Sequence, residues 1–64
     1  MKTYYYTNSW GFHKMLDIQE TPNAEGKYYC MLWETSHGEF CGSAWLTKEE
    51  IKEYFHNNHI EGEF

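Results

Sequence analysis

Four segments of the chain have patterns typical of β-strands: β-forming residues without a helical period, or apolar and polar residues in alternation. Met1 to Thr7 is expected to form the first strand, because three consecutive tyrosines stand between threonines without a helical period. In Phe12 to Glu20, Leu16 and Ile18 share one face, while the other face is more polar. This second segment therefore predicts a strand with one buried face.

Two further segments continue the β pattern. Lys27 to Thr35 has large apolar side chains on both faces, which is typical of a strand covered on both sides or exposed to a partner on one. Ser36 to Gly38 predicts a tight hairpin turn into a fourth strand, Glu39 to Trp45. Strict alternation places the following residues on one face: Phe40, Gly42, Ala44 and Leu46. The small residues among them would leave room for a helix close to the sheet.

The C-terminal segment has the pattern of a capped helix. Thr47 and Glu50 have the spacing of a capping box, and Leu46 and Ile51 stand at the positions of a hydrophobic staple. One apolar stripe follows at helical spacing: Ile51, Tyr54 and Phe55. The helix is expected to fray near Asn57 and to stop by Gly62.

Turn chemistry at Asn8 to Gly11 and at Thr21 to Gly26 separates the first three strands. The segments together predict an α+β fold: a four-stranded antiparallel β-meander with one C-terminal helix packed on one face (ββββα). Residues 1–64 are expected to form a single domain, because a chain of 64 residues has room for one core.

Charge and composition narrow the functional classes. The net charge is −5 and arginine is absent, so binding to nucleic acid through its phosphates is not expected. Aromatic residues make up 20% of the chain, more than so small a core can hold, and the surplus is expected on a surface. The N-terminus lacks the apolar run of a signal peptide and no segment approaches membrane-spanning length, which predicts a cytoplasmic protein without a membrane partner.

Chemistry other than binding has little support in the sequence. Cys30, Cys41 and His37 surround one hairpin, and His56 and His59 lie on the predicted helix, but their spacing matches no zinc signature. The cysteines are expected to remain reduced, because the hairpin sets their Cα atoms too far apart to bridge. No motif supports Cys41 and His37 as a nucleophile and base. The sequence therefore predicts no enzyme activity, no metal and no cofactor.

A single helix can cover only one side of a four-stranded sheet, so aromatic residues on the other side are candidates for a binding surface. The aromatic candidates for partner binding are Tyr4, Tyr6, Tyr29, Trp33 and Trp45. The acidic candidates, which would meet a basic groove on the partner, are Glu34, Glu39, Glu49 and Glu53.

The leading functional prediction is a small acidic protein-binding module. In size, acidity and aromatic content, though in no motif, the chain resembles phage counter-defence inhibitors such as anti-CRISPR proteins and uracil-DNA glycosylase inhibitors. This resemblance implies a basic, nucleic-acid-handling enzyme as the partner. Two alternatives stay open: a single-stranded nucleic-acid binder that stacks bases on sheet aromatics, as in PUR-type domains, and a structural homodimer within a larger assembly.

Overall fold

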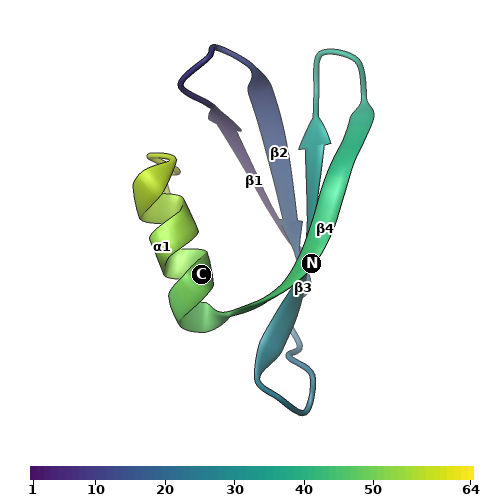
Figure 1. Ribbon diagram of the computed structural model, residues 1–64, viewed down its shortest axis with the longest axis vertical. Coiled ribbons are helices and arrows are strands. Elements are labelled where there is room, and N and C mark those ends of the chain that lie inside the picture. The colour runs from purple at the N-terminus through teal and green to yellow at the C-terminus, as the bar shows by residue number, and fades with distance from the viewer.

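Four antiparallel strands lie side by side in chain order in the computed structural model, which describes residues 1–64, and one helix follows them (Figure 1). The elements are β1 (Lys2–Thr7), β2 (His13–Ile18), β3 (Lys27–Glu34), β4 (Glu39–Thr47) and α1 (Lys48–Asn57). The predicted β-meander with one C-terminal helix is confirmed.

The two longer loops are each organised by one asparagine. The side-chain oxygens of Asn8 and Asn23 accept hydrogen bonds from the backbone N–H groups two and four residues further along, over 2.9–3.0 Å. An Asn side chain that mimics a backbone turn in this way closes the loop without help from the core.

The core lies between α1 and one face of the sheet. Its buried apolar residues are Leu16, Ile18, Cys30, Ile51, Phe55 and Ile60. Ile18 in the sheet and Ile51 in the helix are almost completely inaccessible. Figure 1 shows α1 on one side of the sheet only, and no element of the chain covers the other side.

The start of α1 has the predicted capping box. The Glu50 amide donates to Thr47 Oγ1 over 3.2 Å, and the Thr47 amide donates to Glu50 Oε1 over 2.9 Å. The bond from the Thr47 amide, followed by the contribution of the Thr47 side chain, holds the pKa of the Glu50 carboxyl below its usual value. Leu46 packs against the core cluster that contains Ile51, in keeping with the predicted hydrophobic staple.

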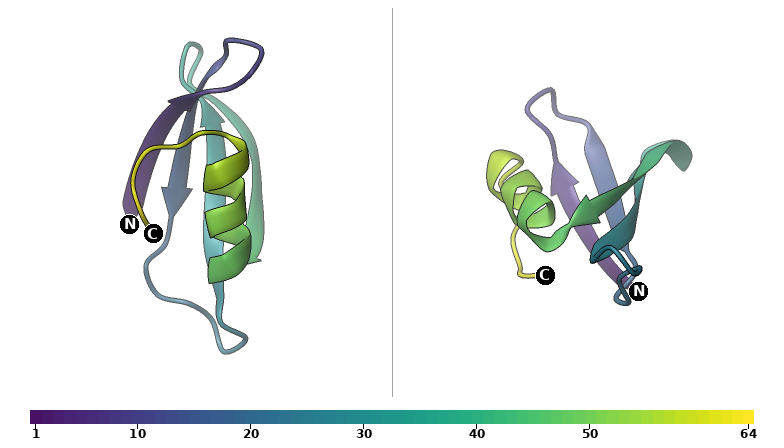
Figure 2. Two further views of the ribbon diagram at one scale, coloured as in Figure 1. Left: turned by 90° about the vertical axis from the view of Figure 1, so that its left-hand side faces the viewer. Right: turned by 60° about the horizontal axis from the view of Figure 1, so that its bottom comes forward.

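After α1 the chain folds back across the core toward β1 (Figure 2, left). Ile60 is buried, and the Tyr4 hydroxyl donates to the Glu63 carbonyl over 2.7 Å. Phe64 packs edge-on against Tyr28, with ring centroids 4.6 Å apart. This tail, for which the sequence pattern predicts no role, is an integral part of the core.

The strand β4 contains a β-bulge. Leu32 pairs with Gly42, but Trp33 pairs with Phe40, so Cys41 has no partner on β3. The expectation that Phe40 shares a face with Gly42 is therefore wrong, because one extra residue between them changes the alternation. Gly42 takes φ 143°, a conformation that residues with a side chain rarely adopt.

Candidate functional site

The two faces of the sheet differ in what covers them. On one face, called here the helix side, the side chains of β1–β4 pack against α1 and the C-terminal tail. The other face, called here the open face, has no covering layer. Its apolar residues are Tyr5, Met15, Tyr29, Met31, Trp33, Phe40 and Trp45. All four strands contribute to this set, so it extends across the full width of the sheet.

Several large side chains of the open face are freely accessible. Tyr5 is 70% exposed, Trp45 51% and Phe40 49%. An aromatic side chain of this size buries about 150–250 Å² of accessible surface when it is packed inside a protein. The open face is therefore an uncovered apolar surface, and not a second core.

The rings of the open face contact one another in pairs. Trp33 and Phe40 have ring centroids 5.1 Å apart, and Tyr29 and Trp45 have centroids 5.0 Å apart. Both pairs join β3 to β4. Pairing of this kind limits the motion of each ring. The Trp33 Nε1 is buried by its neighbours and has no hydrogen-bond acceptor in the chain.

The aromatic candidates from the sequence divide between the two faces. Tyr29, Trp33 and Trp45 lie on the open face. Tyr4 and Tyr6 lie on the helix side, where they are partly buried and pack against the core. The sequence therefore grouped residues that point to opposite sides of the sheet.

The contacts of these two tyrosines are structural. The Tyr4 ring packs edge-on against Phe55 with centroids 4.7 Å apart, and the Tyr6 and Tyr54 hydroxyls share a hydrogen bond. Burial raises the pKa of both the Tyr4 and the Tyr6 hydroxyl, and for Tyr6 the bond to Tyr54 adds to the effect. Both side chains hold β1 to the helical layer.

The acidic candidates do not gather around the aromatic ones. Glu49 and Glu53 are exposed on α1, which lies on the opposite side of the sheet from the open face. Glu39 is exposed at the start of β4, directly opposite Glu34. The acidic and aromatic candidates therefore form no single surface.

Glu34 is only 7% exposed and has a structural role in the β3–β4 turn. Its carboxylate accepts from the Ser36 amide over 2.9 Å and from the His37 amide over 3.0 Å, and His37 Nδ1 lies 3.1 Å away. These contacts, with the Ser36 amide the strongest, hold the pKa of the Glu34 carboxyl at about 2. An oxygen that accepts so many bonds within the chain is poorly placed to meet a partner.

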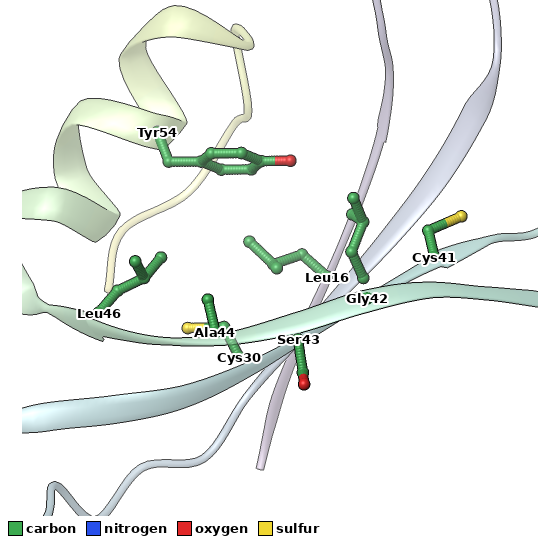
Figure 3. A pocket seen from close by; sticks show the side chains of 9 residues that line it. Leu16, Cys30, Cys41, Gly42, Ser43, Ala44, Leu46 and Tyr54 are labelled. Carbon is green, nitrogen blue, oxygen red and sulfur yellow. The ribbon is translucent and has the colours of Figure 1, made fainter.

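The helix side has a small apolar groove of about 210 Å³ between α1 and the β3–β4 hairpin (Figure 3). Figure 3 shows Tyr54 on one side of the groove and Leu16, Ala44 and Leu46 on the other, while Ser43 points away from it. The lining offers shape and apolar contact but few polar groups to orient a ligand.

Both cysteines line this groove as free thiols. Cys30 is buried, and burial raises the pKa of its thiol to about 11, so it is a protonated, weak nucleophile at neutral pH. Cys41 is exposed, and Lys14 Nζ approaches its sulfur at 3.6 Å. His37 contacts Glu34 and is not in hydrogen-bond contact with Cys41.

Two further features of the structure bear on function. The histidines, cysteines and acidic residues form no group of three or more that could hold a metal ion. The single helix is too short and too polar to cross a bilayer.

Four residues of the open face are not among the candidates drawn from the sequence: Tyr5, Met15, Met31 and Phe40. For Tyr5 the signal was available, since alternation sets it opposite its two tyrosine neighbours. For Phe40 no such signal existed, because the bulge that turns it to the open face interrupts an otherwise regular alternation.

Comparison of the chain with protein-family models, with curated proteins and with solved structures finds no match. What the chain does is therefore inferred from its own residues.

Proposed function

We propose that this protein is a non-catalytic binding module whose open face docks onto another protein. The observation that carries the proposal is the uncovered set of rings and methionines on that face, with Trp45 and Phe40 about half exposed. Tyr, Trp, Phe and Met are the residues enriched in protein interfaces, and exposed apolar patches of this kind mark interaction sites.

The charge of the chain favours a basic partner. Ten acidic residues against five lysines give a net charge of −5. The rings would supply contact area, while the acidic side chains on α1 and in the loops would attract a positively charged protein over a longer range. Added salt is then expected to slow association. A nucleic-acid-handling enzyme inhibited by this module is the specific form of the proposal that the composition favours.

Site-specific photo-crosslinking tests the proposal. A photoreactive phenylalanine analogue at position 45 is expected to give a covalent adduct with another protein in the cells in which this protein naturally occurs. The same analogue at position 10 is the matched control, because Trp10 is also highly exposed but lies in the β1–β2 loop. An adduct that depends on position 45 and disappears in the Phe40→Ser variant supports the proposal.

Other outcomes decide against it. An adduct between two copies of the chain would favour a homodimer, and an adduct with an oligonucleotide would favour single-stranded nucleic-acid binding. Equal adducts from positions 10 and 45, or none from position 45, would overturn the assignment of the open face as the binding surface.

A further inference from the structure

Asp17 is a buried carboxylate in the middle of the open face. It is only 8% exposed, and its side chain points away from the core residues Leu16 and Ile18 on either side. Thr3 Oγ1 donates to Asp17 Oδ1 over 2.7 Å, which confirms that both side chains are on the same face. The other carboxylate oxygen has no hydrogen-bond donor in the chain. This oxygen keeps some contact with solvent. Trp33 Nε1 is the only side-chain nitrogen or oxygen that is both fully buried and without a hydrogen-bond partner.

The register shows what surrounds this carboxylate. Asp17 belongs to a row that crosses the sheet and contains no aromatic residue: Thr3, Asp17, Met31 and Ser43. The row on one side consists of Tyr5, Met15, Trp33 and Phe40. The row on the other side includes Tyr29 and Trp45. Trp33 and Tyr29 are the diagonal neighbours of Asp17 on β3, about 7–8 Å away between Cα atoms.

No cation of the chain neutralises Asp17. No lysine forms an ion pair with a carboxylate in the structure, and the only contact between a basic and an acidic side chain joins the His37 imidazole to Glu34. Lys2 and Lys14 lie over the rings of Phe64 and Phe12 instead. Buried carboxylates in proteins are normally paired with a cation or fully hydrogen-bonded, because desolvation of the charge is otherwise costly.

We propose that the partner of the open face inserts a lysine or arginine side chain against Asp17, between the rings of Trp33, Tyr29 and Tyr5. This inference rests on the proposed function and adds the chemistry of the contact. The carboxylate supplies the opposite charge, and ring faces within about 6 Å of a cation add cation–π attraction. Arginine suits the site best, since its planar guanidinium stacks on rings while it donates to a carboxylate.

The same arrangement disfavours phosphate groups and purely apolar partners as ligands. A phosphate would meet a buried negative charge at the centre of the surface. A purely apolar partner would cover Asp17 and leave its free oxygen without water or a donor, which is unfavourable for a charged group. A cationic side chain neutralises the charge of Asp17 and donates a hydrogen bond to its free oxygen.

Two capped tripeptides test the inference on the wild-type protein: acetyl-Gly-Arg-Gly-amide and the same peptide with citrulline. Citrulline has the shape of arginine without its charge. Titration into the millimolar range is followed by NMR of the three indole N–H signals. We expect the arginine peptide to shift the Trp33 and Trp45 signals and not that of Trp10, and the citrulline peptide to bind about tenfold more weakly. Equal binding of the two peptides, or no shift with either, would overturn the inference.

Substitution then locates the charge. Asp17→Asn keeps an acceptor for Thr3 and is expected to abolish the preference for arginine over citrulline. Glu53→Gln removes the same charge from the exposed face of α1 and is expected to retain the preference. A preference that survives in Asp17→Asn would overturn the assignment to Asp17. The peptide comparison requires no variant, so it decides the question even if Asp17→Asn does not fold.

The inference and the proposed function fail separately. If position 45 still cross-links a protein while Asp17→Asn binds that protein as well as the wild type does, the open face is an interface without a cation contact. If position 45 cross-links nothing, the proposed function itself is wrong.

Discussion

Glu34 shows how one side chain can look like a surface acid in the sequence and serve the fold in the structure. Its two oxygens accept bonds from the Ser36 and His37 amides, so the carboxylate closes the β3–β4 turn from within the chain. A charge-assisted bond to a backbone amide is stronger than a neutral one. The turn therefore depends on the ionised form of Glu34.

We predict that Glu34→Gln, which mimics the protonated acid, lowers the melting temperature at neutral pH. The pKa of Glu34 lies at about 2 in the folded protein, below its usual value of 4.5, so folding favours the ionised form. The stabilisation is complete above about pH 4.5 and is lost as the pH falls from 4.5 to 2. Thermal melts of the variant and the wild type should therefore converge near pH 2. Glu39→Gln, at the opposite and exposed position, is the control. Its melting temperature should show no difference from the wild type that disappears near pH 2.

At the scale of elements, α1 depends on its first turn. We predict that Thr47→Ala destabilises the fold by about 1 kcal/mol, because the Glu50 amide loses its acceptor. In a domain of this size that loss lowers the melting temperature by about 4–8 °C. Thr21→Ala, in the exposed β2–β3 loop, is the matched control and should leave the melt unchanged.

The C-terminal tail is the second element with a measurable role. Ile60 is 7% exposed and belongs to the core cluster, so Ile60→Ala should lower the free energy of unfolding by about 2–5 kcal/mol. Urea denaturation measures this change. Glu61→Ala, at the next and exposed position, should cost little. Equal effects of the two substitutions would show that the tail does not pack as the structure has it.

The elements that could be predicted from the sequence are those with local signals. The capping box at Thr47 and the alternation around Leu16 and Ile18 depend on neighbours within a few residues, and both are confirmed. The tail could not be predicted in this way, because the bond from Tyr4 to Glu63 joins residues 59 positions apart.

The candidate site was only partly predictable for the same physical reason. Alternation separated Tyr29 and Trp33 from the core side of β3, but it could not decide which face of β1 meets the helix. That choice set Tyr4 and Tyr6 under α1 and Tyr5 on the open face. It follows from the packing of α1 against the whole sheet and has no local signal.

At the scale of the whole molecule, the protein has two layers and one uncovered face. Residues of that face should matter more for binding than for folding. We predict that Trp45→Ser lowers the free energy of unfolding by only about 0.5–1.5 kcal/mol, mainly through the lost ring contact with Tyr29. Ile51→Ala, beneath the helix, should cost about 2–5 kcal/mol. Urea denaturation of both variants measures the difference, and a larger loss for Trp45→Ser would mean that the open face is part of the core.

The bulge at Cys41 has a consequence for how the gene can change. Loss of one codon within a strand usually exchanges its two faces and is therefore among the most damaging small mutations. Loss of codon 41 is an exception, because Phe40 and Gly42 already pair with adjacent residues of β3. Such a deletion would leave a regular strand in which all the remaining side chains keep their present faces. Loss of codon 44, by contrast, would turn the residues before it to the wrong sides. Homologues one residue shorter in this strand are therefore expected to have lost the residue at position 41.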